Sequence, residues 1–192
     1  MPYPDTHKPK TREKILHSAA RLFSWHGFDN VSIDAVMADV GLTRGAFYSH
    51  FSDKGALYAE AISYAALHSQ LVKYKPASPG ENRLQALLDV YLSHQHVGQE
   101  AFPCPLAFLA TDVGHRDPLV RNTYTRVYQN MVKRIGKHGL SQSKRENRLA
   151  ATAMMIGGVA IARALDDPET VDELLAACRK FGLVLLEEEE NG

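Results

Sequence analysis

Residues 31–54 decide the fold of the first part of the chain and read Val-Ser-Ile-Asp-Ala-Val-Met-Ala-Asp-Val-Gly-Leu-Thr-Arg-Gly-Ala-Phe-Tyr-Ser-His-Phe-Ser-Asp-Lys. Ser32 and Thr43 are typical N-cap residues, and each precedes a short segment in which apolar residues recur at helical spacing. Gly41 lies between the two segments and suits a sharp turn. Two short helices joined around a glycine, with a longer helix before them, are the outline of a helix-turn-helix.

The second of these helices has an outer face of small residues. If Phe47 points to the core, Phe51 lies on the same side, whereas Gly45 and Ser49 point outward. A helix that only has to be soluble more often carries Lys, Glu or Gln there, because these residues favour the helix. Gly45 costs roughly 1 kcal/mol relative to Ala and allows another molecule to approach the backbone closely.

Helical periodicity recurs in the rest of the chain, and period-two alternation is hardly sustained anywhere. We therefore expect an all-α protein. The first helix is predicted to begin at the N-cap Thr11 and to end at Gly27, where a left-handed backbone is expected. We expect about nine helices, at residues 11–26, 33–39, 44–50, 54–74, 82–98, 105–113, 118–138, 142–165 and 169–188.

Composition excludes some classes of protein. The chain has 192 residues, of which 45% are hydrophobic and 23% are charged, as in an ordinary globular protein. Basic and acidic residues number 22 each, so the formal net charge is zero. A neutral chain does not coat nucleic acid through bulk electrostatics, although it can still read a specific sequence.

Several features favour a cytoplasmic location. Cys104 and Cys178 are too few for a disulfide framework and do not form a metal-ligand pair, which fits a reducing compartment. The longest charge-free apolar stretch, residues 149–162, is shorter than the about 17 to 25 residues of a membrane span. The N-terminus lacks the apolar core of a secretory signal. No transmembrane helix is expected.

The run from Gly41 to Phe51, followed by Lys54, resembles the DNA-binding domain of TetR-type transcriptional regulators. The resemblance implies a helix-turn-helix domain over residues 1–53 and a helical effector-binding and dimerisation domain over residues 54–192. It also implies a homodimer that regulates transcription at a palindromic operator in response to a small-molecule effector, most often as a repressor. It implies neither enzyme activity nor a cofactor.

The resemblance also assigns the DNA contacts. Phosphate contacts are expected from Ser32, Thr43, Tyr48, His50 and Lys54, and base contacts from Arg44, Gly45, Ala46 and Ser49. Helix N-termini favour a phosphate, because free backbone N–H groups and the positive end of the helix dipole face it. Among these residues, only Arg44 has a guanidinium group whose paired donors suit O6 and N7 of guanine. Such a contact favours the correct base pair over the others by about 1–3 kcal/mol. Without the resemblance, Tyr48 is equally well a half-buried core tyrosine and His50 a structural histidine.

The helix predicted over 142–165 carries many small residues, including two adjacent glycines that each cost roughly 1 kcal/mol in a helix interior. Close approach by another helix would offset this cost. In the resembling family the last two helices form the dimer interface, which implies interface positions at Ala153, Gly157, Ala160, Ala164, Leu174, Leu175, Cys178 and Phe181. The alternative is an intramolecular core against the helix predicted over 82–98.

The effector is expected to bind in a cavity between the fourth and the seventh predicted helices, which are those over 54–74, 82–98, 105–113 and 118–138. Candidate lining residues are Tyr64, His68, Tyr91, His94, Phe102, Cys104, Phe108, Asp112, Tyr124 and Tyr128. Cys104 precedes Pro105, which suits the first position of a helix, so the thiol is expected at an N-cap, where its pKa can fall. Cys104 is then either a redox or electrophile sensor or an inert packed cysteine, with Cys178 as the comparison.

A helical-bundle metalloenzyme is the rival class, with His94, Asp112 and His115 around a metal ion. Neither an H-E-x-x-H motif nor a paired E-x-x-H motif is present to support it. His94 and His96 are two residues apart in sequence and therefore face apart on a helix. No metal site is expected.

Overall fold

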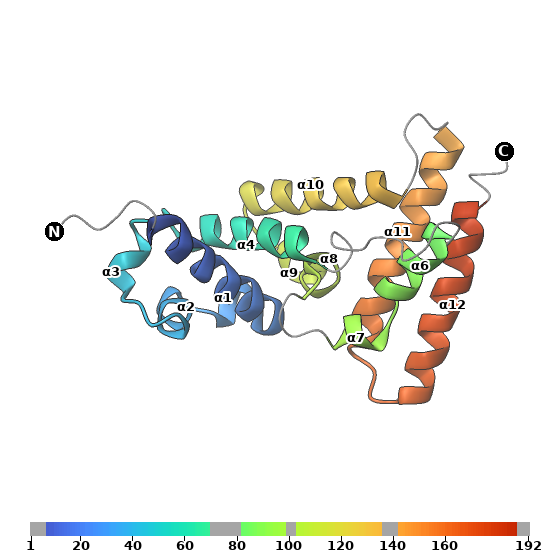
Figure 1. The fold of residues 1–192 in the computed structure, drawn as a ribbon, viewed down its shortest axis with the longest axis horizontal. Helices are drawn as coiled ribbons and strands as arrows, with labels where there is room; N and C mark the ends of the chain where they lie inside the picture. The colour runs from blue at the N-terminus through green and yellow to red at the C-terminus, as the bar shows by residue number, and fades with distance from the viewer. Residues whose placement is uncertain (1–6, 70–81, 99–102, 136–141, 188–192) are drawn as a thin grey trace. The chain divides into compact units, whose positions relative to one another are not determined.

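The computed structural model describes residues 7–69, 82–98, 103–135 and 142–187. Over these ranges the chain has eleven helices and no strand, so the predicted all-α fold is confirmed (Figure 1). None of these helices combines the length and the hydrophobicity that a membrane span requires. They are α1 (His7–Asn30), α2 (Ile33–Asp39), α3 (Arg44–Phe47), α4 (Lys54–His68), α6 (Arg83–Tyr91), α7 (His94–Val97), α8 (Pro105–Phe108), α9 (Ala110–Val113), α10 (Pro118–Ile135), α11 (Gln142–Ala162) and α12 (Pro168–Glu187).

The helices form two compact units. Unit 1 draws on Met1–His68 and Glu100–Val127, and unit 2 draws on Ser69–Gln99 and Tyr128–Gly192. Unit 1 thus combines α1 to α4 with α8, α9 and the first part of α10, whereas unit 2 holds α6, α7, α11, α12 and the rest of α10. The functional boundary expected between residues 53 and 54 stays a prediction, because these units follow packing alone.

The core of unit 1 is built around one face of α1 and one face of α4. Ile15, Ala19 and Phe23 recur at four-residue spacing on α1 and are all fully buried, as the inward stripe of an amphipathic helix requires. The ring of Tyr58 on α4 meets the ring of Phe23 edge-on, with centroids 4.8 Å apart. Phe47 of α3 belongs to the same core. The three N-terminal helices are therefore braced by α4.

The start of α1 differs from the prediction, whereas its end agrees. The helix begins at His7, and the predicted N-cap Thr11 lies inside it. Pro9 is compatible with this early start, because a proline in the first turn lacks only an N–H group that has no helical partner there. Gly27 has a φ of 74°, which breaks the helix where the sequence predicts its end. Gly41, with a φ of 69°, makes the expected turn between α2 and α3.

Two predicted helices are each divided in the structure. The segment predicted over 82–98 forms α6 and α7, because the Ser93 side chain accepts the N–H of His96 and donates to a carbonyl of the preceding turn. A serine that bonds to nearby backbone in this way starts a new helix. The segment predicted over 105–113 is divided at Leu109 into α8 and α9. The single long helices expected in both places were wrong.

The other predicted helices from the fourth onward agree with the structure to within a few residues where they are described. The parts predicted over 70–74, over 136–138 and at 188 lie outside the described residues. Helix ends are the places where local signals are weakest, since the last turns lack half of their backbone hydrogen bonds.

Unit 2 is organised by the packing of α11 against α12. Gly158 of α11 makes this packing close: a Cβ atom there would lie 3.0 Å from Sγ of Cys178 and 3.1 Å from Cδ2 of Leu92. Met155 and Val159 are fully buried on the same helix. Leu92 lies in the segment predicted over 82–98, so the intramolecular alternative considered for the small residues of α11 accounts for one of its two adjacent glycines.

Candidate nucleic-acid interface

All the residues expected to contact DNA belong to unit 1 and lie at or near the starts of α2, α3 and α4. The Ser32 side chain caps α2 by accepting the N–H of Ala35 at 3.0 Å. Thr43 occupies the N-cap of α3, and its hydroxyl makes no cap bond. Asp53 caps α4 by accepting the N–H of Ala56 at 2.8 Å. The free N–H groups of these helix starts carry the positive ends of the helix dipoles.

Helix α3 is shorter than predicted. It ends at Phe47, and two further backbone bonds to the Phe47 carbonyl continue the coil as turns, from His50 at 2.9 Å and from Phe51 at 3.0 Å. Gly45 is a weak helix former, and a helix of one turn has little packing to compensate for it. The expected helix over 44–50 was therefore too long, although the chain keeps its helical sense up to Phe51.

The orientation predicted for α3 is confirmed. Phe47 and Phe51 are buried and their rings stack at 5.6 Å, whereas Gly45 and Ser49 are exposed. Tyr48 is 57% exposed, so the alternative of a half-buried core tyrosine was wrong. The outer face of α3 thus offers an accessible backbone and two hydroxyl groups.

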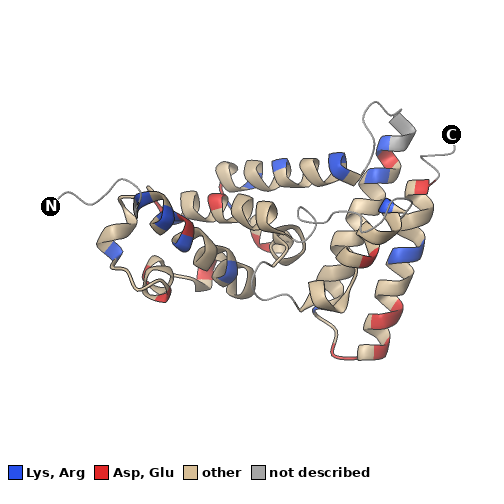
Figure 2. Ribbon diagram, in the orientation of Figure 1, with Lys and Arg blue, Asp and Glu red and all other residues tan. Residues whose placement is uncertain are grey.

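Arg44, the expected reader of guanine, forms an ion pair with Asp34. Its Nη1 donates to Oδ2 of Asp34 at 2.8 Å, and both side chains are exposed, by 59% and 56%. The Tyr48 hydroxyl and then the Asp34 carboxylate raise the pKa of the guanidinium. Asp34 lies in the first turn of α2 and Arg44 begins α3. Figure 2 shows acidic positions on α2 and a basic position on α3. No local pattern pairs them, because the turn between the two helices brings them together.

His50 is half-buried, and its Nδ1 finds no hydrogen-bond partner among the described residues. Burial lowers the pKa of the imidazole, and the charges of Lys8 and Arg12 lower it further. A neutral imidazole is therefore favoured. Nδ1 itself is buried, so the phosphate contact that the sequence predicts cannot use this nitrogen in the present orientation of the ring, and the structural-histidine alternative stays open.

Lys54 points toward the end of α1. Its ammonium lies 4.1 Å from the centroid of the Phe28 ring, as in a cation–π contact, and burial lowers its pKa. The long side chain can leave this contact to reach a phosphate, at the cost of the interaction with Phe28.

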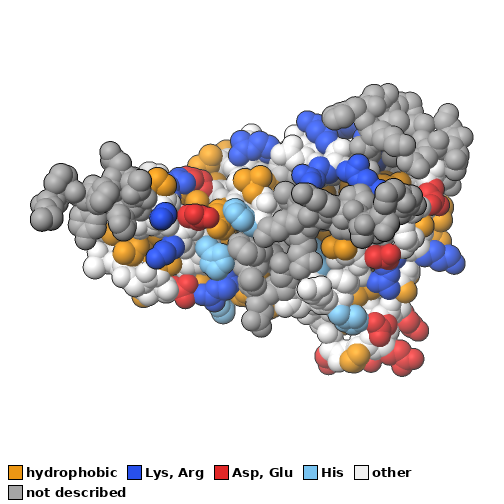
Figure 3. Space-filling view, in the orientation of Figure 1, with side chains coloured by type: hydrophobic (Ala, Val, Ile, Leu, Met, Phe, Trp, Pro, Cys, Tyr) orange, Lys and Arg blue, Asp and Glu red, His pale blue; other side chains and the backbone are white. Residues whose placement is uncertain are grey.

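Figure 3 shows Lys and Arg side chains intermingled with Asp and Glu side chains over the N-terminal helices. The face has no single sign of charge that would attract DNA from a distance. Recognition by this surface therefore depends on local contacts, in line with the zero net charge of the chain.

The family assignment rests on the same segment. Residues 15–61, which include all of α2 and α3, match the family model described as bacterial regulatory proteins of the tetR family. The segment over residues 15–61 is therefore similar to the DNA-binding domain of TetR-type regulators.

Relatives of this TetR-type domain are known, but they match the chain only in part. The HTH-type transcriptional regulator AcrR of Shigella flexneri is 36% identical over 74 residues, which are 38% of this chain and 34% of that protein. The HTH-type transcriptional regulator UidR of Escherichia coli strain K12 is 30% identical over 98 residues, half of each protein. The chain thus matches about a third to a half of the length of these curated relatives.

Similarity over the whole chain is found at the level of fold. A crystal structure of a TetR-family transcriptional regulator from Cytophaga hutchinsonii superimposes with a TM-score of 0.75 at 19% identity, over 95% of this chain and 98% of that one. A crystal structure of a TetR transcriptional regulator from Chloroflexus aurantiacus superimposes with a TM-score of 0.72 at 22% identity, over 92% of this chain and 96% of that one. The helices after the TetR-type domain therefore have the arrangement known from these structures.

A buried polar network joins the TetR-type domain to α9. The carboxylate of Asp112 accepts the hydroxyl of Tyr58 at 2.6 Å, the backbone N–H of Phe28 at 3.3 Å and Nη2 of Arg116 at 3.0 Å. Burial, and then the bond to Asp112, raise the pKa of Tyr58 well above its ordinary value, so the hydroxyl stays a donor. Asp112 was expected to line an effector site, and its carboxylate is instead engaged by three donors of unit 1.

Arg116 extends this network to the end of α1. It makes a two-bond pair with Asp29, at 2.9 and 2.7 Å, and its guanidinium lies 4.6 Å from the centroid of the Phe28 ring. The pair with Asp29 is the main reason that the pKa of Arg116 is raised and that of Asp29 is lowered. The sequence contained no signal for these contacts, because the partners are far apart along the chain.

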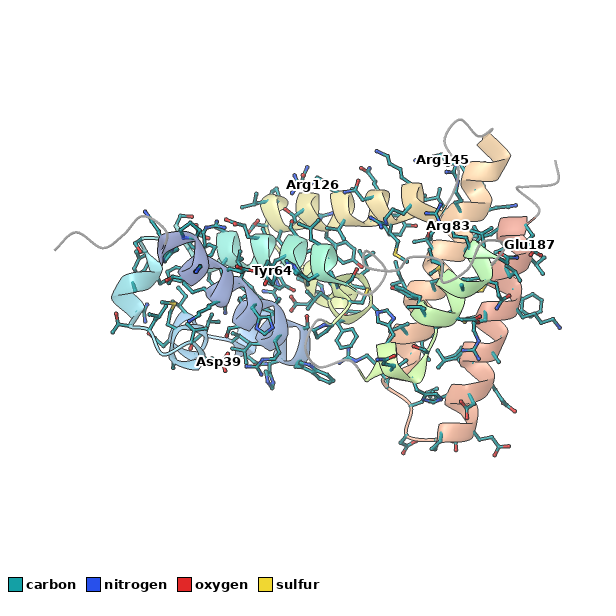
Figure 4. The ribbon with its side chains drawn as sticks, viewed as in Figure 1. Asp39, Tyr64, Arg83, Arg126, Arg145 and Glu187 are labelled. Carbon is teal, nitrogen blue, oxygen red and sulfur yellow. The ribbon has the colours of Figure 1, made fainter. Side chains whose placement is uncertain are left out.

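Several effector candidates lie in unit 1. The rings of Tyr64 and His68 on α4 are 4.0 Å apart (Figure 4). Tyr124 donates its hydroxyl to the carbonyl of Leu106 at 2.7 Å, and Phe108 is half-buried. These contacts are those of a packed core as well as those of a pocket wall.

Other candidates lie in unit 2. Tyr91 is fully buried, whereas His94 is exposed and its Nε2 lies 2.6 Å from Oδ1 of Asp172. Tyr128 is half-buried on α10. Phe102 lies outside the described residues. The candidates thus divide between the two units, and an effector site that uses all of them stays a prediction.

The positions expected at a dimer interface differ in exposure. Leu175 and Cys178 are buried inside unit 2, so they stabilise the packing of α12 on α11. A Cβ atom at Gly157 would meet nothing within 4 Å, in contrast to one at Gly158. Ala153, Ala164 and Phe181 are exposed, and Gly157, Ala160 and Leu174 are half-buried.

Cys104 occupies the N-cap of α8 with Pro105 at the first helical position, as predicted. It is buried, and so is Cys178, whose pKa is raised by burial. A thiol that reagents cannot reach is a poor sensor, so these facts favour the packed cysteine.

The residues of the rival metalloenzyme have other partners or lie apart. No three His, Cys, Asp or Glu side chains gather as metal ligands in the part of the chain that the structure describes. His94 pairs with Asp172, and Asp112 pairs with Arg116. His94 and His115 also belong to different units.

Proposed function

We propose that this chain is a ligand-responsive transcriptional repressor that binds a palindromic DNA operator as a homodimer. The proposal is carried by the outer face of α3, where Arg44, Gly45 and Ser49 are exposed beside the starts of two other helices. A short helix with an accessible backbone fits the major groove, where the base edges differ in their donors and acceptors. A dimer would present two such helices about 34–36 Å or a multiple of it apart.

Large apolar side chains exposed on α11, on α12 and on the segment between them support the homodimer. They are Ile161 on α11, Phe181 and Val184 on α12, and Leu165 between the two helices. Such residues on two neighbouring helices are typical of a surface that is covered in the assembled protein. Gly157 opens toward solvent in the same region of α11, so a second copy could approach the helix backbone closely there.

Support for an effector-dependent change comes from the Asp112 network, which joins α9 to the end of α1. A ligand that binds one arrangement of this segment more tightly than another shifts the population of DNA-binding molecules. The size of that shift is limited by the difference between its two affinities.

The test is selection of bound fragments from random double-stranded DNA by the purified full-length protein. We expect one palindromic sequence to emerge. Arg44→Ala should then reduce the preference for one base pair in each half-site, because it removes the fork that fits guanine. Lys54→Ala should weaken binding to operator and random DNA alike and lower the slope of log K against log salt by about one.

Two results would contradict the proposal. One is selection that enriches no sequence. The other is an Arg44→Ala protein that loses the same affinity for operator and for random DNA, which would make Arg44 a phosphate contact or a folding residue.

A further inference from the structure

An acidic side chain on a DNA-binding face needs a physical reason. Asp34 is 56% exposed in the first turn of α2, next to the start of α3, and its negative charge repels phosphates. Its carboxylate contacts Arg44 at 2.8 Å. An exposed ion pair contributes little to folding, since water screens the charges. The dipole of α2 favours a carboxylate in its first turn, but this interaction does not require the contact with Arg44.

The geometry of the pair leaves Arg44 able to bind a base. A guanidinium has five N–H donors in a rigid planar fork, and two of them suffice for O6 and N7 of guanine. The contact with Asp34 uses Nη1, and the Tyr48 hydroxyl is a second partner of the guanidinium. The long arginine side chain has many rotamers, and a partner on the neighbouring helix removes some of them before DNA arrives.

We infer that Asp34 is a positioning residue that orients Arg44 for guanine and so sets the base preference of the recognition helix. The inference rests on the proposed function and names a residue that determines its specificity. Asp34 acts in two ways. It keeps the guanidinium of Arg44 in one orientation. It also repels the phosphates of DNA, and this repulsion is offset only where Arg44 binds a guanine.

The experiment uses the full-length protein, the operator obtained by selection, and operators changed at the base pair that Arg44→Ala identifies. Asp34→Asn and Asp34→Ala should each lower the preference for guanine at that pair about two- to fivefold, the range for an exposed ion pair. Affinity for random DNA should rise, because a repulsive charge is lost and Arg44 becomes free to bind phosphate. A residue with a merely structural role would lower both affinities together.

Asp39 provides a matched control on the same helix. Its carboxylate accepts the Ser18 hydroxyl at 2.6 Å and Nη2 of Arg21 at 2.7 Å, both on α1 and not on α3. Asp39→Asn removes the same charge from α2 but should leave the preference for guanine unchanged. In an Arg44→Ala background, Asp34→Asn should also leave the preference unchanged, because the residue it acts through is missing.

The inference is overturned if Asp34→Asn retains the wild-type preference, or if Asp39→Asn changes it equally. It is also overturned if Asp34→Asn shifts the preference in the absence of Arg44. These results differ from failure of the proposed function, in which the wild-type protein selects no operator. Circular dichroism of each variant separates a change of preference from loss of folding.

Discussion

At the scale of single residues, the carboxylate of Asp112 joins three segments of unit 1. It accepts a hydroxyl from α4, the backbone N–H of Phe28 near the end of α1 and a guanidinium N–H from Arg116. Tyr58 is fully buried, so its hydroxyl has no access to water if Asp112 is removed. The network therefore stabilises unit 1 mainly because its donors would otherwise be buried without a partner.

Substitution of this network should lower the free energy of unfolding. Tyr58→Phe removes one hydrogen bond and should cost about 0.5–1.5 kcal/mol. Asp112→Ala should cost more, about 1–3 kcal/mol for each buried donor left unpaired. Urea denaturation followed by circular dichroism measures both values.

Tyr124→Phe is the control for this prediction, since that hydroxyl bonds to the Leu106 carbonyl and not to Asp112. Its cost should add to that of Asp112→Ala, whereas the cost of Tyr58→Phe should largely disappear in the Asp112→Ala protein. Full additivity of Tyr58→Phe with Asp112→Ala would show that the two side chains do not interact in solution.

At the scale of elements, the adjacent glycines of α11 have opposite surroundings. Gly158 lies against Cys178 and Leu92 inside unit 2, whereas Gly157 faces open space. One glycine is thus explained by packing within the chain. The other has no neighbour among the described residues, and the proposed dimer provides one.

Gly157→Leu should separate the proposed dimer into monomers and abolish operator binding, because the larger side chain prevents close approach of a second copy. The monomer should still fold, since the space beside Gly157 is open. Light scattering with analytical ultracentrifugation measures the oligomeric state. A Gly157→Leu protein that remains dimeric would show that the second copy binds another surface.

Gly158→Ala tests the fold of unit 2 instead. A Cβ atom 3.0 Å from Sγ of Cys178 forces neighbouring side chains to move, which should cost about 1–3 kcal/mol of unfolding free energy. Gly157→Ala should cost nothing in the monomer and can stabilise it by roughly 0.5–1 kcal/mol through helix propensity. Equal stability of the two alanine variants in urea would contradict the observed packing.

At the scale of the whole molecule, several carboxylates have lowered pKa values in the folded state. The Asp39 pKa is lowered by Ser18 and then by Arg21, and the Asp53 pKa by the Ala56 N–H. Figure 4 shows Asp39 on α2, and its partners lie on α1. Lowered values mean that the folded chain binds protons less readily than the unfolded chain does.

Stability should therefore depend on pH on the acidic side. The contribution of these carboxylates is fully present above the unfolded aspartate pKa of about 3.9 and is lost as the pH falls through the folded values. We expect a free energy of unfolding that declines below about pH 5. Urea unfolding at a series of pH values checks this expectation. Asp39→Asn should reduce the slope of the unfolding free energy against pH. An unchanged slope would show that Asp39 does not contribute to the pH dependence.

The sequence by itself determined the features that depend on neighbours a few residues apart. Apolar spacing predicted the all-α fold, and the caps and glycines predicted the turn at Gly41 and the buried sides of Phe47 and Phe51. The same local pattern identified the TetR-type segment. These predictions succeeded because periodicity, capping and positive φ act within one or two helical turns.

Only the tertiary structure decided which distant residues meet. Asp34 pairs with Arg44 across a turn, Asp112 reaches Tyr58 from another part of the chain, and Gly158 lies against α12. The early breaks after α3 and α6 also depended on competition between helix propensity and local side-chain bonds. A residue's spacing shows which side of its helix it occupies, whereas its partner depends on how the helices pack together.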